Sequence, residues 1–172
     1  FTGRWRTGAE AARARVVVFT DYQCPDCQRV ERELDAYLAA HADTSLSVKH
    51  FPMCPECNRH APNLHPNACW AARAAEVAGA LGGNDGFWRM HRWLFARAGS
   101  FTKAELEAAL PALGFDAPSF QRALNAPESL AGITADVEEA MALGLARTPL
   151  VYVNGVELRG WDAPGAIARG LD

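Results

Sequence analysis

The residues best suited to chemistry are five cysteines, four of which form two Cys-x-x-Cys pairs, Cys24/Cys27 and Cys54/Cys57. The fifth, Cys69, stands apart from both pairs. Paired thiols at this spacing serve either thiol–disulfide exchange or the binding of a soft metal ion such as zinc. They also indicate an oxidising compartment or a catalytic use of the thiols. The sequence around each pair decides between these chemistries.

The first pair lies where an apolar strand gives way to a helix. Arg15–Thr20 is a β-branched run typical of a buried strand, and Pro25 suits the first turn of a helix. Unpaired N–H groups and the helix dipole at this junction lower the pKa of the Cys24 thiol. Cys27 follows one turn later, so it can resolve a mixed disulfide that Cys24 forms. We predict redox chemistry here; a static disulfide or half of a zinc site is the alternative.

The remaining pattern predicts a strand–helix–strand unit, a block of helices, and a β-hairpin followed by a helix. A second strand is expected over Leu46–Phe51, and Asn154-Gly155 suits a two-residue hairpin turn between strands 150–153 and 156–158. We expect Asp162 to cap a last helix that ends near Arg169. The five helical segments expected in the block are 67–81, 87–97, one opened by a capping box at Thr102, one that begins at Asp116, and 128–143.

The segment Phe19–Cys27 (FTDYQCPDC) resembles the active-site segment of thioredoxin-fold proteins of the DsbA-like group. Thr148-Pro149, before a strand and the Asn-Gly hairpin, resembles the cis-proline loop of that fold. A helical block between the second and third strands is also found in that group. The resemblance covers roughly residues 15–170. It implies an α/β thioredoxin-like fold with an inserted α-helical subdomain and the activity of a protein thiol–disulfide oxidoreductase.

This resemblance sets the expected domain organisation. Residues 15–58 and 145–172 are expected to form the thioredoxin-like domain, and residues 59–144 the inserted helical subdomain. Residues 1–14 are expected to be a loose lead-in, the remnant of a tether. The chain opens on Phe1 rather than Met, so we interpret it as trimmed of a targeting segment. Four arginines at this end are assigned to the lead-in rather than to a binding patch: Arg4, Arg6, Arg13 and Arg15.

The resemblance also assigns roles around the first pair. In the family the proline faces the two cysteines and the backbone beside it docks the substrate, which points to Thr148 and Pro149. The dipeptide between the cysteines, Pro25-Asp26, tunes the redox potential. Strongly oxidising members carry a histidine at the second position; the carboxylate of Asp26 instead disfavours a thiolate at Cys24. We expect a potential nearer about −270 mV than about −120 mV.

Two charged residues are candidates for a proton relay. Family members use charged groups beneath the active site to move the proton of the buried cysteine. Asp21 lies three residues before Cys24, and Lys49 lies on the expected neighbouring strand. The alternative is that both side chains face solvent. His91, which has no Cys or Ser at motif distance, is expected at the surface.

The second pair repeats the spacing without the context. Asn58, Pro62 and Pro66 follow it closely and prevent a long helix, so we expect no second thioredoxin-like centre. A Cys-Asn followed by His-Pro-x-Ala-Cys resembles a subset of DsbA-like proteins in which these two cysteines join the loop to the first inserted helix. That resemblance implies a Cys57–Cys69 disulfide and leaves Cys54 as an odd thiol. A Cys54–Cys57 bridge and reduced cysteines are the alternatives.

A zinc site is the competing interpretation of the cysteines. Both pairs together offer four thiolates, with His60 and His65 as further ligands, and a local site is conceivable from Cys54, Cys57, His65 and Cys69. The spacing argues against the four-thiolate site, because 26 residues separate the pairs, more than the usual spacing of roughly 15–20. We therefore expect no metal. A non-enzymatic thioredoxin-fold binding module is the other competing function.

Composition restricts the partners and the location. The net charge of −3 and the pI of about 6.0 argue against a nucleic-acid binder. No apolar run approaches the roughly 20 residues that span a membrane. We expect a periplasmic or other extracytoplasmic monomer, membrane-tethered in its full-length form, that acts on protein thiols and disulfides. A membrane protein or a second thioredoxin-like protein would reset it, and no cofactor is needed because the cysteines carry the electrons.

Overall fold

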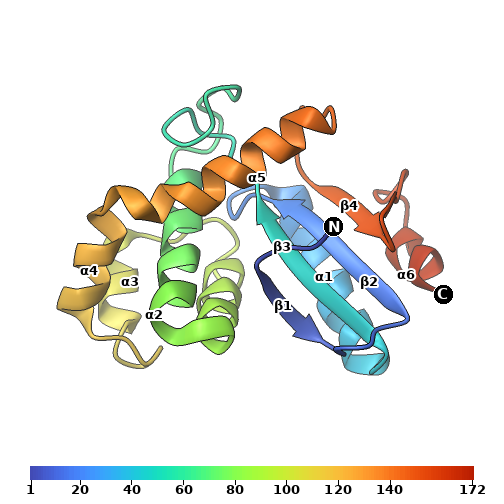
Figure 1. Ribbon diagram of the computed structural model, residues 1–172, viewed down its shortest axis with the longest axis horizontal. Helices are drawn as coiled ribbons and strands as arrows, with labels where there is room; N and C mark the ends of the chain where they lie inside the picture. The colour runs from blue at the N-terminus through green and yellow to red at the C-terminus, as the bar shows by residue number, and fades with distance from the viewer.

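The structure, a computed structural model, describes residues 1–172 as a five-stranded sheet with helices against both faces (Figure 1). The elements in chain order are β1 Trp5–Gly8, β2 Ala14–Thr20, α1 Pro25–Ala40, β3 Thr44–His50, α2 Ala68–Phe95, α3 Lys103–Ala109, α4 Ala117–Asn125, the 3₁₀ turn η1 Pro127–Leu130, α5 Ala131–Ala142, β4 Leu150–Val153, β5 Val156–Glu157 and α6 Ala166–Leu171. The chain is thus mixed α/β, with its helices α2–α5 inserted between β3 and β4.

The sheet is built around β2. Its strand order is β1-β3-β2-β4-β5. β2 runs parallel to β3 and antiparallel to β4, so that Val17 lies opposite both Ser47 and Tyr152. The central position explains the apolar run in β2, because a strand with neighbours on both edges and helices on both faces has no polar surroundings.

Alternating side chains of β2 serve the two faces. Val16 and Val18 pack in the larger core with residues of α1 and α6, whereas Val17 and Phe19 pack with Ile133 and other residues of α5. The last helix of the expected helical block therefore covers the second face of the sheet, while α2, α3 and α4 stand beside it (Figure 1). The division of the chain at residues 59 and 144 stays a prediction.

The helical region follows the sequence signals closely. The two helices expected on either side of Gly82-Gly83 lie within α2, where the non-helical backbone of Gly83, with φ of 65° and ψ of −162°, separates them by a kink. The predicted capping box at Thr102 is present, since Thr102 and Glu105 bond each other's backbone amides. Asp116 caps α4 as predicted by accepting a hydrogen bond from the amide of Ser119.

The expectation of a loose lead-in over residues 1–14 is wrong. Trp5–Gly8 forms β1, the antiparallel neighbour of β3. Ahead of it, the Arg4 guanidinium binds Asp136 of α5 at 2.7 Å and Glu76 of α2 at 3.0 Å, so this arginine is not a tether remnant. A four-residue edge strand with no apolar alternation gives no sequence signal, and both partners of Arg4 are distant in sequence.

The last helix begins later than predicted. Asp162 does not cap it; α6 starts at Ala166, after Gly165 at φ of 70°. Pro164 and the left-handed glycine interrupt the chain between the acidic residue and the helix.

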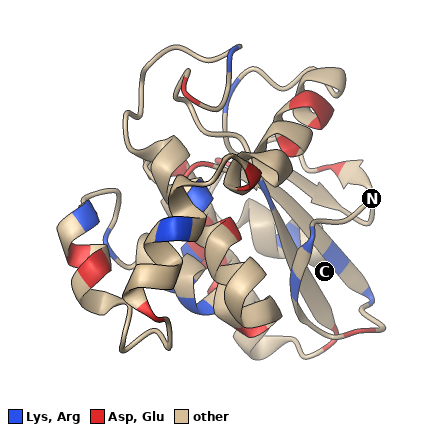
Figure 2. Cartoon of the chain, turned by 60° about the vertical axis from the view of Figure 1, so that its left-hand side comes forward, with Lys and Arg blue, Asp and Glu red and all other residues tan.

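Charged residues of both signs are distributed over the molecule (Figure 2). Basic and acidic residues are interspersed along the elements rather than gathered by sign (Figure 2). None of the helices is both long enough and apolar enough to cross a membrane.

Candidate active site

Cys24 is held at the junction of β2 and α1. Its amide donates to the carbonyl of Asp21 at 3.1 Å, which closes a turn after β2. Its own backbone is extended, with φ of −71° and ψ of 121°, and Pro25 opens the helix directly behind it. The Gln28 amide then donates to the Cys24 carbonyl at 3.1 Å as the first helical hydrogen bond. The sulfur consequently lies at the N-terminus of a sixteen-residue helix, where backbone N–H groups have no helical partner.

The two thiols of the first pair are reduced and differ in burial. Cys24 is 7% exposed and Cys27 is 1% exposed. Hydrogen bonds from the Cys27 thiol and from the Cys27 and Asp26 amides outweigh burial and lower the pKa of Cys24 to about 6. Burial raises the pKa of Cys27 well above its ordinary value, and the neighbouring Cys24 adds to the rise. The outer sulfur is thus the thiolate at neutral pH and the inner one is the thiol.

The Thr148–Pro149 corner lies against this pair. The peptide bond between these residues is cis. The Cys24 thiol is 3.7 Å from the Thr148 carbonyl oxygen, although 124 residues separate them in sequence. The structure therefore brings together four residues that the sequence singled out: Cys24, Cys27, Thr148 and Pro149.

A groove opens beside the corner. A cavity of about 510 Å³ is lined by Asp26, Arg29, Thr148 and Trp161, among others. It shares Arg147, Glu157, Arg159 and Trp161 with a second cavity of about 430 Å³ that reaches Pro149, Leu145 and Tyr152. Together they form a surface depression, polar at one end and more apolar at the other, that includes Asp26 from between the two cysteines and both residues of the Thr148–Pro149 corner.

Asp26, the residue between the cysteines, points outward. Its side chain is 58% exposed and lies 3.3 Å from the guanidinium of Arg29 one turn along α1. Solvent and this arginine therefore screen its negative charge from the Cys24 sulfur.

Asp21 is buried, which contradicts the solvent-facing alternative. Its carboxylate is 1% exposed. It accepts hydrogen bonds from the Gln23 amide at 2.7 Å and the Met53 amide at 2.8 Å, and it pairs with Nδ1 of His65 at 2.8 Å. Asp21 therefore fixes the turn before Cys24 to the loop that follows β3.

Lys49 is also buried, again contrary to the solvent-facing alternative, and its charged partners lie on α5. Its ammonium is 2.6 Å from Glu139 and 3.6 Å from Asp136, both on α5. No hydrogen bond or ion pair joins Lys49 to Asp21. The structure thus gives these two charges different partners, and their joint role as a proton relay stays a prediction.

His65 is a residue near the site that the sequence did not single out for catalysis. Its hydrogen bond to Asp21 raises the pKa of the imidazole, and the nearby Cys24 thiolate adds to the rise. The sequence presented His65 only as a possible zinc ligand, because its partner Asp21 lies 44 residues earlier.

His91 is buried rather than at the surface, so that expectation is wrong. Its Nδ1 is 2.8 Å from the hydroxyl of Tyr22 and its Nε2 is 2.7 Å from Glu31. All three residues are at most 5% exposed. This chain of hydrogen bonds connects the active-site turn, α1 and α2, and it satisfies polar groups that would otherwise be costly to bury.

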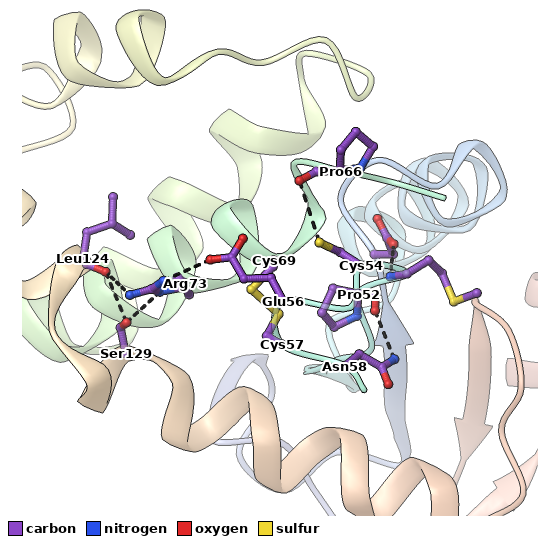
Figure 3. The surroundings of a disulfide bond; sticks show 12 residues. Pro52, Cys54, Glu56, Cys57, Asn58, Pro66, Cys69, Arg73, Leu124 and Ser129 are labelled. Carbon is purple, nitrogen blue, oxygen red and sulfur yellow. Dashed lines mark hydrogen bonds and ion pairs between the residues drawn. A yellow bond between two sulfur atoms is a disulfide. The ribbon is translucent and has the colours of Figure 1, made fainter. Parts of the chain in front are cut away.

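The second cysteine group is separate from the first. Cys57 and Cys69 form a disulfide with Cα atoms 5.7 Å apart, and Cys54 is a buried free thiol beside them (Figure 3). No group of three or more His, Cys, Asp or Glu side chains is arranged to hold a metal ion. The four-thiolate and local zinc sites do not form in this state, because both would need Cys57 as a free ligand.

The sequence itself shows the family of this chain. Residues 15–172 match the DSBA-like thioredoxin domain model. The chain belongs to the DsbA-like thioredoxin family. This membership agrees with the expected thioredoxin-like fold and with the predicted family, that of DsbA-like thiol–disulfide oxidoreductases.

Solved structures share this DsbA-like fold. BdbD from Bacillus subtilis, in its oxidised form, superposes with a TM-score of 0.78 at 18% identity over 99% of this chain and 95% of that one. DsbA2 from Pseudomonas aeruginosa gives 0.75 at 22% identity over 97% and 91%. A thioredoxin-like oxidoreductase from Silicibacter pomeroyi gives 0.70 at 26% identity over 96% and 90%.

Curated relatives include much longer proteins. A sodium/proton antiporter from Mycolicibacterium gilvum is 34% identical over 93% of this chain, and one from Mycolicibacterium vanbaalenii is 34% identical over 88%. The DsbA-like chain spans about a quarter of the length of these antiporters, 25% and 24% respectively.

Proposed function

We propose that this DsbA-like chain exchanges disulfides with protein substrates through its Cys24-Pro25-Asp26-Cys27 motif. The observation that carries the proposal is the contrast between two adjacent thiols. Cys24 has a pKa of about 6 and lies against the Thr148 carbonyl, whereas the Cys27 thiol is buried with a raised pKa. A nucleophile that is ionised at neutral pH beside a protonated partner suits attack followed by resolution.

The reaction proceeds in two exchanges. The Cys24 thiolate attacks one sulfur of a substrate disulfide, and the other substrate sulfur leaves with the bonding electrons and takes up a proton. Cys27 then loses its proton and attacks the Cys24 sulfur, which releases the second substrate thiolate and leaves a Cys24–Cys27 disulfide. Each step exchanges one S–S bond for another. The reverse sequence transfers a disulfide to a substrate dithiol.

The cis-proline corner is proposed to dock the substrate chain. The Thr148 carbonyl next to the Cys24 sulfur offers an acceptor for a substrate backbone amide, and the depression along Arg147 and Trp161 gives room for an extended peptide. A backbone acceptor next to a reactive sulfur aligns a peptide without selecting its sequence.

We infer that the domain works outside the cytoplasm in association with a membrane protein. Two comparisons support this location. The antiporter relatives contain a matching stretch within proteins about four times as long, and a Salmonella enterica structural neighbour is described as a periplasmic thioredoxin-like protein. Such a location also provides the oxidising surroundings in which a Cys57–Cys69 disulfide persists. Its redox partner would then be a membrane protein or another thioredoxin-like protein.

The test is reduction of insulin by dithiothreitol in the presence of the protein. The wild-type chain is expected to accelerate insulin precipitation, Cys24→Ser to abolish the acceleration, and Cys27→Ser to accumulate a mixed disulfide with insulin. Cys54→Ser is the matched control, since this thiol lies outside the motif, and should retain the wild-type rate. A Cys24→Ser variant as active as the wild type would overturn the proposal.

A further inference from the structure

The second Cys-x-x-Cys motif remains outside the reaction proposed for Cys24 and Cys27. Cys54 is 4% exposed, and its thiol donates a hydrogen bond to the Pro66 carbonyl oxygen at 3.8 Å. Figure 3 shows this thiol turned toward Pro66, near the Cys57–Cys69 disulfide. A buried nucleophile beside a disulfide is a reactive arrangement, because a thiolate and a disulfide are the two reactants of thiol exchange.

The backbone gives Cys54 and Cys57 the same local geometry as the first pair. The Asn58 amide donates to the Cys54 carbonyl at 3.1 Å, just as the Gln28 amide donates to the Cys24 carbonyl at 3.1 Å. Each pair therefore spans one helical turn, in which side chains three residues apart are neighbours on one face. The Cα atoms of two cysteines placed in this way are close enough for a disulfide to bridge them.

Cys54 also shares a buried cluster with the other end of the disulfide, Cys69. Cys54, Ala68 and Cys69 form a buried apolar cluster of their own, against which Cys57 packs. Cys57 thus has two cysteine neighbours: Cys69, to which it is bonded, and Cys54, one turn before it. Three sulfurs in one cluster share one disulfide bond, and only one thiol is left over.

We propose that Cys54, Cys57 and Cys69 form a second thiol–disulfide exchange centre in which the disulfide moves between Cys57–Cys69 and Cys54–Cys57. The Cys54 thiol loses its proton and attacks the Cys57 sulfur. A Cys54–Cys57 bond forms, the Cys57–Cys69 bond breaks, and the electron pair stays on the Cys69 sulfur, which takes up a proton. The exchange is neutral in electrons and needs no outside oxidant or reductant.

The exchange changes what the disulfide connects. The Cys57–Cys69 bond ties the loop after β3 to the first turn of α2, twelve residues later. The Cys54–Cys57 bond closes only a local turn within the loop. The second centre therefore has a cross-linked form and a released form, and its reaction is independent of the Cys24–Cys27 pair.

Peptide mapping of a Cys24→Ser/Cys27→Ser variant tests this proposal. The variant is incubated between pH 6 and 9, quenched with acid, and alkylated with N-ethylmaleimide after denaturation. Trypsin then separates residues 50–59, which carry Cys54 and Cys57, from residues 60–73, which carry Cys69. The starting state, with the Cys57–Cys69 bond, gives the two peptides joined and Cys54 labelled. The exchanged state gives an internal disulfide in 50–59 and Cys69 labelled.

We expect label on Cys69 to appear faster as the pH is raised from 6 to 9, because only the thiolate form of a cysteine attacks a disulfide. Cys54→Ser in the same background is the control and should leave Cys69 unlabelled. A second variant, Cys69→Ser, should form the Cys54–Cys57 disulfide in oxidised glutathione while its circular dichroism remains that of a folded chain. Label confined to Cys54 at every pH, or two reduced cysteines in the folded Cys69→Ser variant, overturns the proposal.

Discussion

The acidity of the Cys24 sulfur comes from groups that the Cys-x-x-Cys motif alone does not reveal. Hydrogen bonds from Cys27 and the helix N-terminus lower the pKa of Cys24, while the exposed Asp26 turns toward Arg29 and solvent. His65 lies near Cys24 from a different loop and pairs with the buried Asp21. An imidazolium at this position favours the thiolate, much as a cation within the motif would.

Replacing His65 tests this contribution. The His65→Gln variant is expected to raise the pKa of Cys24 from about 6 by about half a unit, since a partly exposed charge pair contributes about 0.5–1 kcal/mol. The measurement is the pH dependence of alkylation of Cys24 by iodoacetamide. His60→Gln is the matched control, because His60 lies on the same loop but pairs with Glu138. An unchanged alkylation profile in His65→Gln would rule out the contribution.

The potential of the Cys24–Cys27 couple provides a second test at the scale of a residue. Asp26 is expected to keep the potential nearer about −270 mV than about −120 mV, because it supplies no cation to the thiolate. Asp26→His should shift the potential to more positive values by stabilising the reduced form. Titration against glutathione measures both proteins. A wild-type potential near that of the strongest oxidants would contradict the role of Asp26.

At the scale of the elements, ion pairs join segments that are far apart in the chain. Arg4 links the approach to β1 with α2 and α5, through Glu76 and Asp136 respectively. His50 at the end of β3 adds a contact to Glu76 at 2.9 Å. The helices beside the sheet and the helix across its face are thereby attached to the same edge of the sheet.

This network predicts an acid-sensitive stability. Burial opposes ionisation of Glu76, yet His50 and Arg4 hold its pKa at about 2, below its ordinary 4.5. The carboxylate therefore contributes stability that is present above pH 4.5 and is lost as the pH falls toward 2, with a limit of about 3 kcal/mol. Urea unfolding at a series of pH values measures the loss. Glu76→Gln should lose less stability over this range. The control Glu10→Gln, at an exposed position, should lose as much stability as the wild type. An equal dependence of the unfolding free energy on pH in all three proteins would contradict the prediction.

Local signals explain which elements could be predicted from sequence. The sequence predicts features whose signals lie within a few residues: the β2 run, Pro25 at the start of α1, and the caps at Thr102 and Asp116. β1 has no such pattern, so the sequence does not predict this strand. The sequence placed the cysteine pair at a helix start, but the acceptors of His65 and His91 lie 44 and 60 residues away, so their burial and roles required the folded chain.

At the scale of the whole molecule, one loop connects the two groups of cysteines. Met53 and His65 from this loop bond Asp21 in the turn before Cys24, while Cys54 and Cys57 lie in the loop itself. The Asn67 amide, just before α2, donates to the side chain of Gln23 at 2.7 Å. The helical region thus meets the thioredoxin-like sheet at the reactive sulfur, and the stability of the fold and the ionisation of Cys24 are physically coupled.

That coupling predicts how the stability of the reduced protein depends on pH. The pKa of Cys24 is about 6 in the folded chain and about 8.5 in an unfolded one. Between these values the unfolded state binds more protons, so the free energy of unfolding of the reduced form rises with pH by about 1.4 kcal/mol per unit. The oxidised form has no thiol at this position and lacks the rise. We expect the unfolding free energy of the reduced protein, relative to that of the oxidised protein, to rise from pH 6 to 8.5. Below pH 6 this difference should be constant, because Cys24 is then protonated in both the folded and the unfolded chain. Urea denaturation measures both free energies. Cys24→Ala, in which this thiol is removed, should lose the rise, and parallel pH profiles for the reduced and oxidised wild-type forms would show that folding does not favour the Cys24 thiolate.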